Sequence, residues 1–228
     1  MEKRKELILK TIIKEHIKTG APVGSGILDD KYKLDISPDT VRNEMADLEE
    51  GGYIKQPYTS AGRIPTEKAY RLYIGDLKEK KLNREEEELL TAILIEKNEY
   101  NFKQIAKLIS KISDNAVFWA FDRSSLYYTG ISSLLSQPEF VQNDLIYDIS
   151  AIIDKMDEII DKSFNGFEFG TQILLGSNNP FSKHCSAILT KYKLGDKIGL
   201  FGILGPIRMN YEKNLTLIKF ISDKLTEK

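Results

Sequence analysis

The sequence predicts an α+β protein, with a small helical unit at its N-terminus and a larger unit of helices and mainly antiparallel strands after it. At 228 residues the chain is longer than many single domains, which hold roughly 100–200 residues. Its hydrophobic content of 41% and charged content of 29% are close to those of globular proteins. Helix-like periodicity dominates the first part, and the longer β-prone runs come later. We therefore expect domains at 1–75 and 76–228, the second entered through a helical linker at about 76–100.

Composition and charge exclude several classes of protein. A net charge of −1 argues against a strongly basic, histone-like nucleic-acid binder, although local basic patches remain possible. No apolar run approaches the ~20 residues that span a bilayer, and the charged N-terminus does not resemble a secretion signal. One cysteine, Cys185, forbids an internal disulfide, and two histidines add too few ligands for a typical structural zinc site. We expect a cytoplasmic protein without a metal or organic cofactor.

The first 50 residues predict three helices. Apolar spacing predicts the first over roughly residues 3–18, ended by Gly20. Ser25 is placed to cap a short second helix that reaches about Lys31. Ser37 is a favourable N-cap for the third, which we expect to run to about Glu50.

On a helical wheel the third helix has two distinct faces. Val41, Met45 and Leu48 lie together on the face predicted to be buried. The opposite face carries Asp39, Asn43, Ala46 and Glu50, and it is flanked by Thr40 and Arg42.

A basic hairpin is predicted directly after the third helix. Two short strands, at 53–56 and 63–65, are separated by a polar loop with turn residues. Between Ile54 and Tyr73 there are four cations and one acid, so this stretch has a local charge of +3. Three helices followed by a basic hairpin is the order of a winged helix-turn-helix.

This order points to DNA binding. A recognition helix reads base edges, and asparagine can pair with adenine and arginine with guanine, which suits Asn43 and Arg42. Side chains of the hairpin suit phosphate or minor-groove contacts. The residues predicted to contact DNA are Ser25, Ser37, Asp39, Thr40, Arg42, Asn43, Lys55, Tyr58, Thr59, Ser60 and Arg63.

Two simpler interpretations remain open. Arg42 could pair with Asp47, Glu49 or Glu50 on a solvated helix face. A winged helix can also serve as a protein–protein adaptor. The combination of cap, helix, glycine stop and basic hairpin favours DNA binding over both.

Two segments form distinctive motifs, SPDTVRNEMADLE at 37–49 and QPYTSAGRIPT at 56–66, preceded by GAPVGS at 20–25. These motifs resemble those of the heat-inducible transcription repressor HrcA family. Residues 130–140 and 202–211 resemble two further motifs of that family, so the likeness covers most of the chain, weakly between Leu77 and Asp122.

The resemblance implies a bacterial repressor of chaperone genes with a winged helix and a GAF-like domain. It also implies an inverted-repeat DNA operator upstream of chaperonin and DnaK-type operons, a homodimer on that DNA, and control by the chaperonin GroEL, which keeps the repressor active. Members of the family are longer, however. The missing part falls between Phe121 and Leu126, where 122–125 forms a tight turn instead of an inserted dimerisation module. We therefore expect a smaller dimer interface, around Phe118, Trp119, Tyr127 and Tyr128.

The remainder of the chain predicts a reduced GAF-like α+β domain, in which helices flank mainly antiparallel strands. Asn83 with Glu86 is a capping pattern, and Gly195-Asp196 is a plausible hairpin turn. The expected helices lie at 83–94, 101–112, 140–163 and 211–221, and the expected strands at 116–121, 126–129, 172–175, 186–192 and 198–204.

Candidate catalytic residues in this domain have structural explanations, so we do not expect an enzyme. His184 and Cys185 point to opposite faces of a strand and make a poor base–nucleophile pair. The acidic residues between 154 and 161 have the spacing of a wet helix face, and Arg208 could either touch an anion or cap the domain edge. Gly199, Gly202 and Gly205 lack the order of a dinucleotide motif and are assigned to a tight turn. The alternative function is a regulator that senses a small molecule through the GAF-like domain.

Overall fold

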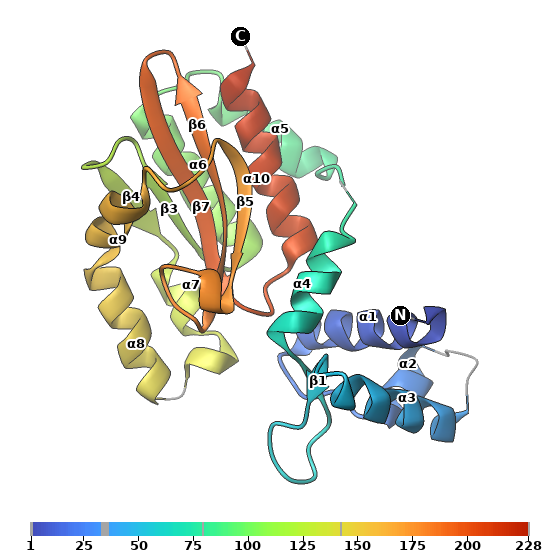
Figure 1. Ribbon diagram of the computed structural model, residues 1–228. Helices are drawn as coiled ribbons and strands as arrows, with labels where there is room; N and C mark the ends of the chain where they lie inside the picture. Colours follow the sequence, from blue (N-terminus) through green and yellow to red (C-terminus); the bar gives the residue numbers. More distant parts are fainter. Residues whose placement is uncertain (1, 33–36, 79, 142, 228) are drawn as a thin grey trace. The chain divides into compact units, whose positions relative to one another are not determined.

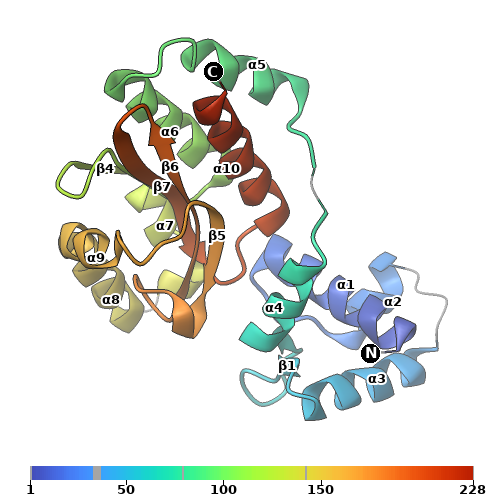
Figure 2. The same ribbon diagram turned by 45° about the horizontal axis from the view of Figure 1, so that its top comes forward.

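The computed structural model describes residues 2–32, 37–78, 80–141 and 143–227. The chain divides into two compact units, Met1–Leu77 and Lys78–Lys228, each of which is described by itself (Figures 1 and 2). The described residues form the predicted α+β structure, with helices and a small sheet first and a larger antiparallel sheet second. No helix among them has the length and apolar character needed to cross a membrane.

The first unit has the predicted order of helices followed by a small sheet. Its two short strands pair antiparallel, with Ile54 opposite Pro65 and Lys55 opposite Ile64. One helix of this unit was not predicted, because it is short and buries only Ala69, Tyr70 and Tyr73. Thr66 caps it, and the Tyr70 hydroxyl lies 2.8 Å from Nδ1 of His16. The elements are α1 (Lys3–Thr19), α2 (Ser25–Tyr32), α3 (Pro38–Glu50), β1 (Ile54–Lys55), β2 (Ile64–Pro65) and α4 (Glu67–Gly75).

Local signals set the ends of these helices. Gly20 adopts a left-handed conformation with φ of 67°, and its N–H donates to the carbonyl of His16 to close α1. The side chain of Ser37 accepts from the backbone N–H of Thr40, as expected of an N-cap. Ser25, which we expected as a cap, is instead the first residue of α2.

The second unit is built on an antiparallel sheet. Among the described residues, five strands lie in the order β4–β3–β7–β6–β5. The β6–β7 hairpin turns at Gly195, as predicted, with φ of 62°. The strands are β3 (Ala116–Ala120), β4 (Leu126–Thr129), β5 (Gly170–Leu175), β6 (Cys185–Leu194) and β7 (Lys197–Pro206).

Helices cover both faces of this sheet (Figure 1). On one face Phe102 stacks on Trp119 at 4.8 Å between ring centroids. On the other face Phe118 packs in a core with Ile149 and Met156. The first face is covered by α6 (Glu99–Ser113) and α10 (Tyr211–Thr226), with α5 (Arg84–Ile93) against α6. The second is covered by α7 (Ile131–Leu135), the short 3₁₀ turn η1 (Pro138–Phe140), α8 (Asn143–Asp154) and α9 (Met156–Ser163), and another 3₁₀ turn, η2 (Gly176–Asn178), follows β5.

The prediction of a single helix over 140–163 is wrong. The segment is divided into η1, α8 and α9, with a break at Lys155, whose φ is −107° and ψ is 10°. The break allows Ile149 of α8 and Ile160 of α9 to reach the same core. Apolar spacing continues through it, so helical periodicity could not reveal it.

Two further expectations are corrected. Phe118 and Trp119 are buried, with 1% and 0% of their surface exposed, so neither is available to an interface. Gly199, Gly202 and Gly205 lie inside β7 and form no tight turn. Gly202 is needed for close packing, because a Cβ there would come within 2.7 Å of the Ile188 carbonyl oxygen and 2.8 Å of the Phe118 ring.

Candidate nucleic-acid interface

The outer face of α3 is exposed as predicted. Asp39, Asn43, Ala46 and Glu50 are all exposed, whereas Val41, Met45 and Leu48 are buried. Arg42 is exposed as well, and its Nη1 lies 2.8 Å from Oδ1 of Asp39. Arg42 therefore pairs toward the start of α3, not with Asp47, Glu49 or Glu50. This pair directs the guanidinium toward the end of the helix that is expected to read bases.

Hydroxyl groups gather at the start of α3. The Oγ of Ser37 accepts from the Thr40 N–H at 3.2 Å and lies 2.9 Å from the Thr40 Oγ1. Ser37 is exposed and Thr40 half-exposed, so both hydroxyls remain accessible while they stabilise the cap. The first turn of α3 therefore presents two accessible hydroxyl groups, which can donate hydrogen bonds to an oxyanion such as phosphate.

The loop between β1 and β2 carries exposed polar and aromatic side chains. Tyr58 is 66% exposed, and Lys55 and Thr59 are also exposed. The Ala61 N–H donates to the Tyr58 carbonyl, and Ser60 between them has a φ of 64°. Within the described part of the chain, the Lys55 ammonium makes no ion pair, so it is available to a phosphate.

A hollow joins α3, the start of α2 and this loop. Its volume is about 440 Å³, and it brings together four of the predicted DNA-contacting residues, namely Ser25, Arg42, Ser60 and Arg63. Asn43 and Lys55 lie outside it. The prediction missed five other residues of its lining. Ala46 already lay on the outer face of the helical wheel, whereas Gly24, Met45, Ala61 and Gly62 carried no polar signal.

Arg63 differs from the other predicted contacts. Its Nε donates to Oε2 of Glu49 at 2.8 Å, and its side chain is only 26% exposed. The sequence alone indicates Glu49 only as a partner for Arg42. Because 14 residues separate Glu49 from Arg63, local spacing could not indicate their contact.

The polar residues singled out in the second unit have structural partners or surroundings. Burial raises the pKa of the Cys185 thiol to about 12, so at neutral pH it is not a thiolate nucleophile. Arg208 pairs with Glu139 and donates to Gln137 at 2.8 Å, which joins the two motifs at 130–140 and 202–211 at the domain edge. The described residues contain no group of three or more histidine, cysteine or carboxylate side chains suited to a metal.

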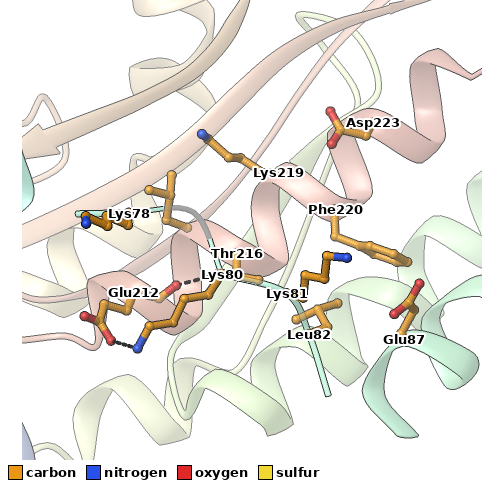
Figure 3. Close-up of a pocket in the computed structure, with 11 residues that line it drawn as sticks. Lys78, Lys80, Lys81, Leu82, Glu87, Glu212, Thr216, Lys219, Phe220 and Asp223 are labelled. Carbon is orange, nitrogen blue, oxygen red and sulfur yellow. Dashed lines mark hydrogen bonds and ion pairs between the residues drawn. The ribbon is translucent and has the colours of Figure 1, made fainter. Parts of the chain in front are cut away.

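A cavity of about 300 Å³ lies between Lys78, residues 80–82 and α10 (Figure 3). Leu82, Leu215 and Phe220 make part of its lining apolar. Lysines and carboxylates surround them, and Lys80 pairs with Glu212 at 2.5 Å. The mixed lining suits a small amphipathic molecule better than a simple anion.

Comparison with known proteins relates the whole chain to one family. Residues 53–215 match the family described as the HrcA protein C terminal domain. The heat-inducible transcription repressor HrcA of Pelotomaculum thermopropionicum is 27% identical, over all of this chain and 96% of the relative. That alignment extends over 335 positions, so more than a hundred have no counterpart among these 228 residues.

Other comparisons support the local sequence likeness and the fold. The repressor HrcA of Desulforudis audaxviator is 52% identical over 90 residues, which are 40% of this chain and 26% of the relative. A crystal structure described only as that of a hypothetical protein has a TM-score of 0.78 and 16% identity, with 99% of this chain and 98% of that chain covered. The last likeness concerns the fold alone.

Proposed function

Because the chain belongs to the HrcA family, whose relatives are transcription repressors and not enzymes, we propose that it is a sequence-specific repressor of heat-shock chaperone genes. The observation that carries this proposal is the exposed α3 face with Arg42 and Asn43, followed in the chain by a hairpin with the exposed Lys55. The first unit then acts as a winged helix-turn-helix, with α3 in the major groove of an inverted-repeat operator.

The predicted contacts divide into two kinds. Asn43 pairs with an adenine edge, and Arg42 exchanges Asp39 for a guanine edge. Contacts to the DNA backbone supply affinity without sequence preference. This second set comprises Ser25, Ser37, Thr40, Lys55, Tyr58, Thr59 and Ser60.

The second unit serves regulation and assembly in this proposal. We assign it a GAF-like role, with GroEL as the partner that maintains the active repressor. A homodimer supplies the two reading heads that an inverted repeat requires. The protein acts in the cytoplasm, where its operator is accessible.

A titration at controlled salt tests the proposed function. The duplexes are an inverted-repeat chaperone operator, a single half-site and a scrambled sequence. We expect selective, cooperative binding to the full repeat, with affinity that falls as salt rises because counterions are released from phosphates. Equal binding to all three duplexes would contradict sequence-specific repression, and loss of binding at every salt concentration would contradict DNA binding itself.

The cavity between Lys78, residues 80–82 and α10 favours a second candidate, a regulator that senses a small amphipathic molecule. Short aliphatic and aromatic carboxylates are suitable probes. A ligand of this kind is expected to raise the melting temperature and change operator affinity together. Failure of every probe to do both would count against this candidate without affecting DNA binding.

A further inference from the structure

One carboxylate joins the end of α3 to both ends of the β1–β2 loop. Oε2 of Glu49 accepts from the Arg63 Nε at 2.8 Å, and Oε1 accepts from the Gln56 backbone N–H at 3.2 Å. Gln56 directly follows β1, and Arg63 directly precedes β2. Glu49 therefore holds the loop at the two points where it leaves and re-enters the sheet.

The side chains of Gln56 and Arg63 also form hydrogen bonds within the loop. The Gln56 Nε2 donates to the Ala61 carbonyl at 3.1 Å, and the Arg63 Nη1 donates to the same oxygen at 3.3 Å. Arg63 thus makes hydrogen bonds to Glu49 and to Ala61 at the same time. Such a network restrains the loop more than a single ion pair would.

A third attachment joins the loop to the α1–α2 junction. The Arg63 N–H donates to the Val23 carbonyl at 2.9 Å, and the Val23 N–H donates to the Arg63 carbonyl at 2.8 Å. Gly62 allows this approach, because a Cβ there would lie 2.6 Å from the Val23 carbonyl carbon and 2.8 Å from the Gly24 nitrogen. The loop is therefore held on two sides before any DNA is present.

The negative charge of Glu49 is unfavourable at a DNA-binding surface. An acid at a surface that binds a polyanion repels phosphate, so its simple electrostatic effect is to weaken binding. The hydrogen bonds of Glu49 give it a compensating role, since a preorganised loop avoids an ordering cost when it binds.

We propose that Glu49 and Arg63 are positioning residues of the DNA interface. Glu49 orients the loop that carries Tyr58 and Thr59, and Arg63 acts through Glu49 and Ala61, not as a contact to phosphate. This inference rests on the proposed function, and it replaces the phosphate role first assigned to Arg63.

The decisive variants are Glu49→Gln and its neighbour Glu50→Gln. Each removes one negative charge from the end of α3, and within the described residues Glu50 makes no ion pair. Electrostatics alone predicts tighter operator binding for both. A positioning role predicts different changes in operator affinity for the two variants. Glu50→Gln binds with unchanged or slightly higher affinity, whereas Glu49→Gln binds about 10-fold more weakly, because hydrogen bonds to a charged group are lost. Equal tightening of both variants would overturn the proposal.

A double-mutant cycle separates the two roles of Arg63. If Arg63 acts through Glu49, the double variant Glu49→Gln with Arg63→Gln binds no more weakly than the worse single variant. A phosphate contact would instead give additive losses and a salt slope reduced by about 0.9, the change expected for Lys55→Ala. Additivity together with that reduced slope would restore the phosphate role.

Hydrogen exchange in the free protein tests the positioning without DNA. We expect Glu49→Gln to accelerate exchange of the Ala61 and Arg63 amides by about 10-fold, while Glu50→Gln leaves them unchanged. Gly62→Ala is expected to accelerate the same amides without altering any charge, and thermal unfolding checks that each variant folds. Unchanged exchange in Glu49→Gln would overturn the positioning role even if DNA binding were confirmed. Failure of the wild type to bind DNA would overturn the proposed function, whatever the exchange result.

Discussion

Side chains on the outer face of α3 differ in how strongly the free protein holds them. Arg42 and Asp39 form an exposed pair three residues apart on one helix, and such pairs contribute only about 0.2–0.5 kcal/mol. A base edge can therefore displace Asp39 from Arg42 at little cost. The Asn43 amide is exposed and makes no hydrogen bond within the described part of the chain, so it can meet a base without breaking one.

We predict that Asn43→Ala changes both the affinity and the base preference of operator binding. The variant should lose about 1–3 kcal/mol of operator binding and tolerate substitution at one base pair, because a bidentate contact to adenine is removed. Titrations of the operator and of single-position operator variants measure both effects. Binding to the scrambled duplex is the control, and an equal loss on that duplex would contradict base reading by Asn43.

Among the elements, the β3–β4 hairpin shows how a short turn joins the edge strand β4 to its neighbour β3. The Oδ1 of Asp122 accepts from the backbone N–H groups of Ser124 at 2.7 Å and Ser125 at 2.9 Å, and from the Ser124 hydroxyl at 2.9 Å. The backbone N–H of Ser124 is the main cause of the lowered pKa of Asp122, because it stabilises the carboxylate. The turn predicted at 122–125 is thus supported by its first residue.

We predict that Asp122→Ala lowers the free energy of unfolding at pH 7 by about 0.5–1 kcal/mol, a modest loss because the site is exposed. The folded-state pKa of Asp122 is lowered, so its stabilisation is present above the ordinary carboxyl pKa. It is lost as pH falls through the lower, folded-state value. Denaturant unfolding of wild type and variant between pH 7 and acid should therefore converge at low pH.

Asp122→Asn is the matched variant, since it keeps an acceptor oxygen and removes the charge. Its stability difference from Asp122→Ala is expected to vary little with pH. A gap between wild type and Asp122→Ala that persists unchanged into acid would show that the carboxylate is not what stabilises the turn.

For the whole molecule, the proposed homodimer requires a surface through which two copies meet on DNA. More than a hundred positions of the aligned relative are absent here, and Phe118 and Trp119 are buried in their own unit. Of the surface first expected to dimerise, Tyr128 is 41% exposed, on β4 at the edge of the sheet. A two-fold symmetric operator nevertheless requires two reading heads.

We predict two chains on each full operator and one on a half-site, because each winged helix reads one half of the repeat. Sedimentation of the protein with each duplex at micromolar concentration measures this stoichiometry. Tyr128→Lys is expected to weaken cooperative binding to the full repeat while half-site affinity is retained. A single chain on the full operator would contradict the homodimer.

The sequence alone determined features that depend on neighbours within about one helical turn. The caps at Ser37 and Asn83, the two faces of α3 and the β6–β7 turn at Gly195 could be predicted, because each follows from local backbone geometry and periodicity. Only the tertiary structure revealed the break at Lys155 and α4. It alone also brought Glu49 to Arg63 and Gly62 to Val23, because those contacts join segments distant along the chain. The local spacing of residues in the sequence cannot reveal such contacts, since they arise when the folded chain packs hydrogen-bonding groups and backbone against each other.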